Sequence, residues 1–130
     1  MEVKLNWPII FESMQWLLVE ELKRRVPVHD GDLRTSIKGK IRNKELLIYM
    51  LSYGLDLEYG TLPGRWVSVD DLKKWCKDKW GSEYLAEVLQ SHIYLYGTKP
   101  HPFIRETLIQ EFPRILADAL KTPGAVEAFN

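Results

Sequence analysis

The stretch 26–37 places the strongest local constraint on how this chain can fold. Pro27 has no backbone N–H, fixes its own φ and disfavours helical geometry at the residue before it. A helix arriving from the N-terminal side is therefore expected to end just before Pro27. Gly31 predicts a turn, because glycine adopts positive φ without strain. Leu33 and Ile37, four residues apart, predict a short helical turn before the chain becomes extended.

The first half of the chain predicts a long helix followed by a β-hairpin. Apolar residues recur at helical spacing before the stretch, and three basic residues close the last turn, where the helix dipole favours cations. Beyond residue 37, apolar and basic residues alternate, then Asn43 and Lys44 predict a tight turn. The apolar run 45–52 predicts a strand covered on both faces, by the first helix and by another helix or subunit. The predicted inner stripe of the first helix is Ile10, Met14, Leu17, Leu18 and Leu22.

Two shorter helices are predicted within residues 62–97. Ser68 and Asp71 have the spacing of a capping box, and Gly81 is expected to end the first of these helices. Ser82 is expected to cap the second, which should stop at Gly97. The predicted inner stripes are Leu72, Trp75, Cys76 and Lys79 or Trp80 in the first helix, and Leu85, Val88, Leu89, His92, Ile93 and Tyr96 in the second.

A last helix is predicted within residues 98–122, with a kink at Pro113, which removes a backbone hydrogen bond. Residues 123–130 are expected to form a frayed tail. The predicted inner stripe of this helix is Ile104, Leu108, Phe112, Ile115, Leu116 and Ala119. The fold class expected is α+β: a single domain, 1–130, in which helices 1–25 and 98–122 pack on a small, mainly antiparallel sheet within 26–61, with 62–97 as an inserted helical hairpin.

Composition excludes several classes of protein. The chain has 130 residues, of which 45% are hydrophobic and 28% charged, which is ordinary for one soluble globular domain. No apolar run is long enough to span a bilayer, and no signal peptide is seen. The 18 basic and 18 acidic residues cancel, which argues against a protein that grips phosphates across its whole surface. Cys76 is the only cysteine, so an intramolecular disulfide is impossible.

Three pieces of the sequence resemble a known family. Residues 26–37, Val-Pro-Val-His-Asp-Gly-Asp-Leu-Arg-Thr-Ser-Ile, resemble the Val-Pro-Val-x-x-Gly-x-Leu-x-x-Ser-Ile signature of small tailed-phage morphogenesis proteins of the neck, where head meets tail. Residues 53–61 resemble the family's Tyr-Ala-x-x-Val-Glu-Phe-Gly-Thr, with Gly54 in place of the usual Ala. Residues 97–103, Gly-Thr-Lys-Pro-His-Pro-Phe, resemble the segment that opens the family's last helix. With the flanking helices, these pieces account for nearly the whole chain.

The resemblance implies a structural virion protein rather than an enzyme. It would join or complete the tail at the head–tail interface, with other neck and tail proteins as partners and with repeated copies around the tail axis. It would be assembled in the host cytoplasm and reside in the virion. The residues that carry the signature are Pro27, Gly31, Leu33, Ser36, Glu58, Gly60, Thr61, Gly97, Thr98, Pro102 and Phe103.

No residue pattern argues for catalysis, a metal or a cofactor. His29, Asp30 and Asp32 invite comparison with a metal or acid–base site, but such residues more often satisfy the backbone of a turn. His92 and His101 could share a zinc ion only if the tertiary fold happened to bring them together. Cys76 has no local base and is expected in the core. Glu58 is interpreted as a structural acceptor, for the Gly-Thr turn that follows it or for Arg34, with a catalytic role as the alternative.

Binding surfaces are the remaining candidates. Strand residues Lys38, Lys40 and Arg42, with Arg34 nearby, form the best candidate for a passive contact with double-stranded DNA, and otherwise they are the solvated face of a sheet. Five tryptophans are more than a small core readily buries. The expected protein interface is Trp66, Trp75, Trp80 and Tyr84. A second hypothesis is a stand-alone cellular module, derived from a prophage, that binds nucleic acid or protein.

Overall fold

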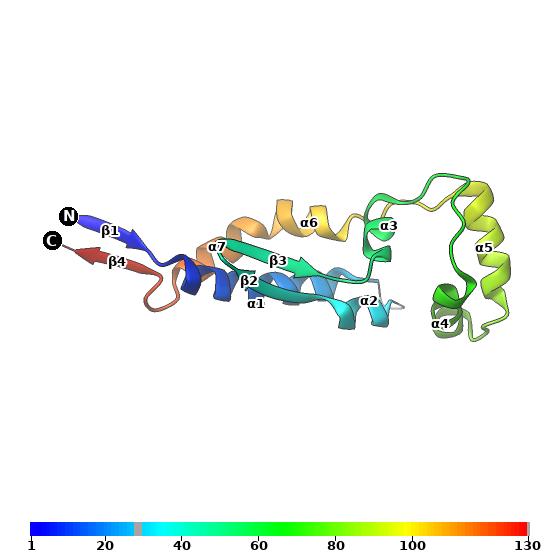
Figure 1. The fold of residues 1–130 in the computed structure, drawn as a ribbon, viewed down its shortest axis with the longest axis horizontal. Coiled ribbons are helices and arrows are strands. Elements are labelled where there is room, and N and C mark those ends of the chain that lie inside the picture. Colours follow the sequence, from blue (N-terminus) through cyan, green and yellow to red (C-terminus); the bar gives the residue numbers. More distant parts are fainter. Residues whose placement is uncertain (28–29, 130) are drawn as a thin grey trace. The chain divides into compact units, whose positions relative to one another are not determined.

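The computed structural model describes residues 1–27 and 30–129, and these residues form seven helices and two small antiparallel sheets (Figure 1). The predicted α+β fold class is confirmed. The chain divides into two compact units, one made of Met1–Val26, Leu33–Leu51 and Phe103–Asn130, the other of Pro27–Asp32 and Ser52–Pro102. The prediction that 1–130 is a single domain stays a prediction, which would be tested by whether the two units unfold together.

Helix α1 (Trp7–Arg25) is the central element of the first unit. Pro8 lies in its first turn, where the missing N–H costs nothing, and Val26 ends it with φ −64° and ψ 136°, as expected of a residue that precedes proline. The buried residues of the predicted stripe are Ile10, Met14, Leu18 and Leu22, while Leu17 is half-buried. The helix and its end are therefore as the sequence predicted.

The short helix α2 (Gly31–Ser36) leads into a hairpin of β2 (Lys38–Arg42) and β3 (Glu45–Tyr49). Asn43 has φ 55° in the predicted two-residue turn. The side-chain amide of Gln15 donates to the carbonyl of Gly39 at 2.8 Å, which ties β2 to α1. Another helix does not cover the face of β3 opposite α1 among the described elements, since Tyr49 is 48% exposed there, and cover by another subunit stays a prediction.

Helices α6 (Phe103–Gln110) and α7 (Phe112–Leu120) replace the single last helix that was predicted. The break falls at Glu111 because Pro113 has no N–H to donate to the preceding turn, so the kink was placed correctly. Phe103, Thr107, Ile115 and Ala119 are buried, but Leu108, predicted to be inside, is 45% exposed. The buried face of α6 is set by Phe103 and Thr107, whose hydroxyl donates to the Phe103 carbonyl at 2.7 Å.

An ion cluster joins α1 to the two C-terminal helices. Glu21 on α1 is only 6% exposed, and its carboxylate accepts from Arg24 and, at 3.2 Å, from Arg25. Arg114 of α7 lies 3.7 Å from the same carboxylate, and Arg25 lies 3.3 Å from Glu111. Burial by itself would raise the pKa of Glu21, but the hydrogen bonds and charges of Arg24 and Arg25 outweigh burial and lower it.

The two ends of the chain pair in a ribbon that the sequence did not predict. Strand β1 (Glu2–Leu5) is antiparallel to β4 (Val126–Phe129), so the prediction of a frayed tail over 123–130 is wrong for residues 126–129. The backbone N–H of Asn6 also donates to the carbonyl of Ala125 at 2.9 Å, and Ala125 is fully buried. Both strands are exposed along their whole length, and Figure 1 shows them extending beyond α1 and α7.

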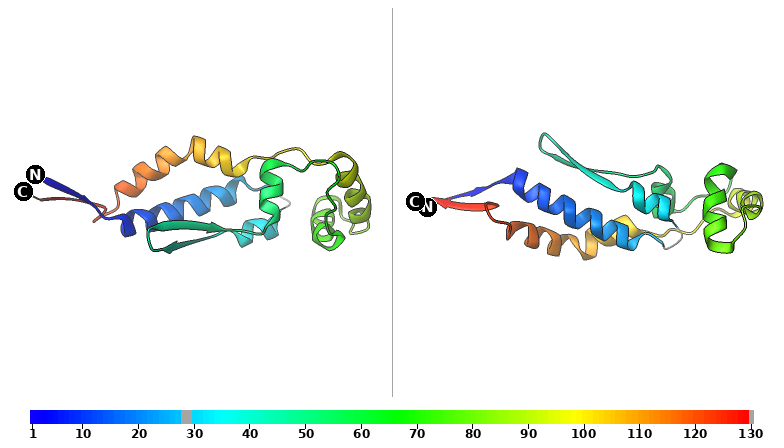
Figure 2. Two further views of the ribbon diagram at one scale, coloured as in Figure 1. Left: turned by 45° about the horizontal axis from the view of Figure 1, so that its top comes forward. Right: turned by 90° about the horizontal axis from the view of Figure 1, so that it is seen from below.

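The first unit is layered around α1. Figure 2 shows, in its right-hand view, the hairpin on one side of α1 and the C-terminal helices on the other. Residue contacts agree, because α1 meets β2, β3, α6 and α7, whereas the hairpin has no comparable contact with α6 or α7. One side of α1 is consequently left without a covering element.

The second unit contains α3 (Tyr53–Tyr59) and the helical pair α4 (Val69–Trp80) and α5 (Leu85–Tyr96). Gly54 does not interrupt α3, where it is buried. Ser68 occupies the N-cap position of α4 but makes no capping hydrogen bond, and Gly81 ends α4 in left-handed geometry, with φ 74°. Ser82 does not cap α5, which begins three residues later. The predicted helical hairpin is present, since α4 and α5 pack on one another.

We predict that Glu21→Gln lowers the free energy of unfolding by about 1–3 kcal/mol at pH 7, because the neutral amide leaves the surrounding arginines without their shared anion. The lowered pKa means that the carboxylate stabilises the fold above its unfolded value, near 4.5, and that this contribution disappears as the pH falls through the lower folded value. The difference between the two proteins, measured by urea unfolding, should therefore shrink below about pH 4.5. Glu20→Gln, at an exposed neighbour, is the control. An equal difference at pH 3 would contradict the assignment.

Candidate functional site

The second and third signature pieces meet at a bridge between Thr61 and Thr98. Their backbones exchange two hydrogen bonds, from the N–H of Thr61 to the carbonyl of Thr98 at 3.2 Å and from the N–H of Thr98 to the carbonyl of Thr61 at 2.9 Å. The hydroxyl of Thr98 also accepts from the N–H of Thr61 at 2.9 Å and lies 3.0 Å from the hydroxyl of Thr61. The N–H of His101 donates to the carbonyl of Leu57 at 2.7 Å. We call this arrangement, residues 60–61 with residues 97–98, the Thr61–Thr98 clasp.

Two signature glycines make the clasp sterically feasible. Gly60 has φ 71°, and a Cβ there would lie 2.5 Å from the carbonyl oxygen of Thr98. Gly97 has φ 73°, and a Cβ there would lie 2.1 Å from the carbonyl oxygen of Thr61. Both positions combine a positive φ and a ψ near 180°, which glycine alone readily adopts, with a close backbone neighbour, so no L side chain fits at either. Gly60 and Gly97 therefore allow the two ends of the inserted segment to lie together.

The first signature piece also serves the fold. Leu33 is fully buried, and the N–H of Asp30 donates to the carbonyl of Pro27 at 3.0 Å. The hydroxyl of Ser36 donates to the carbonyl of Leu33 at 2.6 Å and accepts from the N–H of Leu51 at 3.0 Å, which ties α2 to the end of the hairpin. Gly31 does not use the positive φ that glycine permits, because it is the first residue of α2 rather than part of a left-handed turn.

Glu58, Pro102 and Phe103 complete the signature. Glu58 lies in α3 with 1% of its surface exposed, and no buried side-chain nitrogen or oxygen of the described residues lacks a hydrogen-bond partner. Phe103, the first residue of α6, is fully buried, and Pro102 before it is half-buried. A satisfied, buried carboxylate fits the structural interpretation of Glu58. No group of three or more His, Cys, Asp or Glu residues among the described residues is placed to hold a metal ion beside it.

The four predicted DNA-channel cations do not form one group. The guanidinium of Arg34 donates to the carbonyls of Lys23 and Val26, each at 3.0 Å, where it satisfies the C-terminal end of α1. Lys38, Lys40 and Arg42 are exposed and alternate along β2, so they share one face of the hairpin. The structure thus brings three of the four cations together and assigns the fourth to a helix terminus.

The predicted interface residues are largely uncovered. Trp66, Trp80 and Tyr84 are 61%, 47% and 92% exposed, and Trp75 is half-buried. Trp75 and Trp80 meet edge to face with ring centres 5.1 Å apart, and the ammonium of Lys79 lies 4.6 Å from the Trp75 ring centre. Because these aromatic rings keep much of their apolar surface in water, they are available to a partner.

Helix α5 buries a different face from the one that was predicted. Its buried residues are Ala86, Gln90 and Ile93, and the amide of Gln90 donates to the carbonyl of Val67 at 2.8 Å. His92, predicted to be inside, is exposed and lies against Tyr96 with ring centres 4.9 Å apart. Apolar residues occur on nearly every side of this helix, so periodicity could not choose its inner face. Its outward apolar residues are Leu85, Val88, Leu95 and Tyr96.

Sequence reasoning missed two exposed tryptophans on α1. Trp7 is 49% exposed and lies 5.7 Å from the ring of Phe11, and Trp16 is 69% exposed. A signal for Trp16 was present, because it lies about 200° around the helix from both Met14 and Leu18 of the buried stripe.

Metal and thiol chemistry receive no support from the described residues. No group of three or more His, Cys, Asp or Glu residues there is placed to hold a metal ion. His29 lies outside the described residues, while His92 and His101 are exposed. Cys76 is fully buried, and burial raises the pKa of its thiol, which disfavours the reactive thiolate. Cys76 is thus a core residue of the α4–α5 pair.

The chain was compared with protein-family models, curated proteins and solved structures, and none of them matches it. Among residues 1–27 and 30–129, no helix has both the length and the apolar character needed to cross a membrane.

We predict that alanine is tolerated at one signature glycine, Gly31, and destabilises the fold at another, Gly97. Gly97→Ala should lower the free energy of unfolding by more than about 2 kcal/mol, because a Cβ collides with the backbone of Thr61 at a left-handed position. Gly31→Ala should change it by less than about 1 kcal/mol, since a Cβ there meets no described atom within 4 Å. Urea unfolding of the two variants tests this directly. Equal loss of stability in both would mean that Gly31 meets a constraint absent from this structure.

Proposed function

We propose that this protein is a structural, non-enzymatic assembly protein of the neck of a tailed virus or prophage, which joins or completes the tail at the head–tail interface. Its place would be the virion, reached by assembly in the host cytoplasm, and its partners would be other neck and tail proteins and further copies of itself. The proposal rests on the ordered resemblance of three sequence pieces. The observation that carries it is the amount of aromatic and aliphatic surface that the single chain leaves exposed.

Four of the five tryptophans are at least 47% exposed: Trp7, Trp16, Trp66 and Trp80. Tryptophan is enriched where subunits meet, so exposed tryptophans are side chains that a subunit can bury against its neighbours. The outward residues of α5 support the same reading, because that helix carries only one charged residue, Glu87.

The terminal ribbon gives independent support. Val3, Leu5, Val126 and Ala128 lie on one face of it, because Val3 pairs with Ala128 and Leu5 with Val126. Both strands are exposed, and an isolated two-stranded ribbon is marginally stable in water. A ribbon of this kind is stabilised when its apolar face packs on another protein, as a virion would provide.

The second candidate is a stand-alone cellular module that binds nucleic acid or protein. The exposed cations Lys38, Lys40 and Arg42 are the specific observation in its favour. Tight binding of the isolated protein to duplex DNA, lost steeply as salt rises, would support this candidate. Absence of such binding would favour the assembly role.

We predict that deleting the gene from a virus that carries it leaves DNA-filled heads beside unattached tails, seen by electron microscopy of the lysate. Expression of the wild-type protein in trans should restore joined particles. The double variant Tyr84→Ser and Val88→Ser, at the N-cap and on the outward face of α5, should restore fewer, because both side chains are more than half exposed and available to a neighbour. Lys77→Ser and Lys99→Ser, also exposed, form the control variant. Normal infectious particles without the gene would overturn the proposed function.

A further inference from the structure

The outer face of the β2–β3 hairpin is cationic and partly apolar. Lys38 pairs across the hairpin with Tyr49, and Lys40 pairs with Leu47, so all four side chains project from the face opposite α1. Tyr49 is 48% exposed, and Leu47 is half-buried. Arg42, which pairs with Glu45, closes this face with an ion pair of 3.9 Å. We call these residues, Lys38, Lys40, Arg42, Leu47 and Tyr49, the hairpin face.

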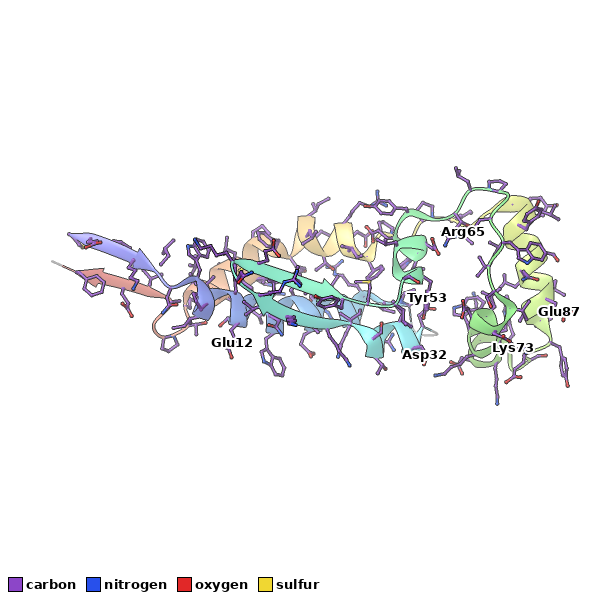
Figure 3. All side chains as sticks on the ribbon, in the orientation of Figure 1. Glu12, Asp32, Tyr53, Arg65, Lys73 and Glu87 are labelled. Atoms are coloured by element: carbon purple, nitrogen blue, oxygen red, sulfur yellow. The ribbon has the colours of Figure 1, made fainter. Side chains whose placement is uncertain are left out.

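A second exposed surface, on α1, has the opposite charge. Glu12, Trp16 and Glu20 are spaced four residues apart and are all exposed, so they form a stripe along the uncovered side of the helix. Figure 3 shows Glu12 pointing away from the other elements of its unit. Trp16, between the two carboxylates, is 69% exposed. We call these three residues the α1 stripe.

The two surfaces match in charge and in chemistry. Within the described residues, neither Glu12 nor Glu20 has an ion-pair partner, and neither Lys38 nor Lys40 has one. The stripe offers a large aromatic ring between two carboxylates. The hairpin face offers a tyrosine and a leucine beside two ammonium groups. The carboxylates of one surface thus complement the ammonium groups of the other, an arrangement that favours a specific protein contact.

We propose that the hairpin face of one copy of this protein docks on the α1 stripe of a second copy. Lys38 and Lys40 would pair with Glu12 and Glu20, and Trp16 would pack against Tyr49 and Leu47. The pairing is a property of the isolated chain, while its place in a virion rests on the proposed function.

The contact joins two different surfaces, so it is heterologous. After the first contact forms, one copy keeps a free α1 stripe and the other keeps a free hairpin face, so further copies can be added. A heterologous contact closes into a ring when its rotation permits, and otherwise it continues as a filament. A ring is the arrangement that repeated copies around a tail axis require.

A second copy fits the hairpin face better than DNA does. Leu47 and Tyr49 lie among the cations, and an aliphatic side chain gains little from a phosphate backbone. The chain has a formal net charge of zero, which gives duplex DNA no long-range attraction. DNA binding by the same lysines is therefore the alternative outcome of the experiment.

Reciprocal charge reversal tests the pairing. One variant carries Lys38→Glu and Lys40→Glu, and the other carries Glu12→Lys and Glu20→Lys. Sedimentation velocity should show concentration-dependent association of the wild type at low salt, weakened about tenfold or more in either variant alone, because like charges then face one another. An equimolar mixture of the two variants should associate as the wild type does, since each reversed surface then meets a complementary one.

The control variant is Lys77→Glu with Lys99→Glu, which makes the same charge change at exposed positions outside both surfaces and should associate as the wild type does. Thermal unfolding checks that each variant is folded. A wild type that stays monomeric at every concentration would overturn the proposal, as would a mixture that fails to regain association. Salt-sensitive binding to duplex DNA, lost in the lysine variant while its self-association persists, would assign the hairpin face to nucleic acid instead.

This experiment separates the two proposals. Restored association in the mixture, together with normal particles from a virus lacking the gene, would keep the self-contact and remove the neck assignment. Unattached heads and tails in the absence of the gene, together with a monomeric wild type, would keep the neck assignment and remove the self-contact.

Discussion

The C-terminal end of α1 is the constraint on which the first unit depends. Pro27 forbids continuation of the helix, and the guanidinium of Arg34 then donates to two of the carbonyls that the helix end leaves open. These two interactions set where α2 begins. The hydroxyl of Ser36 then links α2 to the end of the hairpin by accepting from the N–H of Leu51. With α1 ended at this point, its buried stripe is matched in length by α6 and α7. The ion pair between Glu21 of α1 and Arg114 of α7 links these helices.

The Thr61–Thr98 clasp is the corresponding constraint in the second unit. Its hydrogen bonds bring together the two ends of the 62–97 segment, so the helical pair α4–α5 leaves and rejoins the chain at one place. The geometry depends on Gly60 and Gly97, whose backbone conformations exclude other residues. A segment inserted at such a clasp can vary in sequence without altering what lies on either side of it.

Sequence reasoning succeeded where one physical signal dominated. Proline chemistry placed the end of α1 and the α6–α7 break, glycine placed the ends of α4 and α5, and strong periodicity identified the buried face of α1. It failed where tertiary contacts decide. The pairing of β1 with β4 joins the two ends of the chain, which no local pattern reports, and α5 carries apolar residues on too many sides for periodicity to select one. Charge alone likewise did not separate Arg34, which serves a helix terminus, from the three exposed cations of β2.

The residues that carry the family resemblance and the residues offered to partners are almost entirely different. Leu33, Glu58 and Phe103 are buried, and Gly60 and Gly97 are required by backbone geometry, so the signature describes how the chain folds. The exposed tryptophans, the outward side of α5 and the hairpin face lie outside it. On the proposed function, the choice of neighbours depends on the exposed surfaces, where Glu12 and Glu20 of α1 and Lys38 and Lys40 of the hairpin have no ion-pair partner within the described residues.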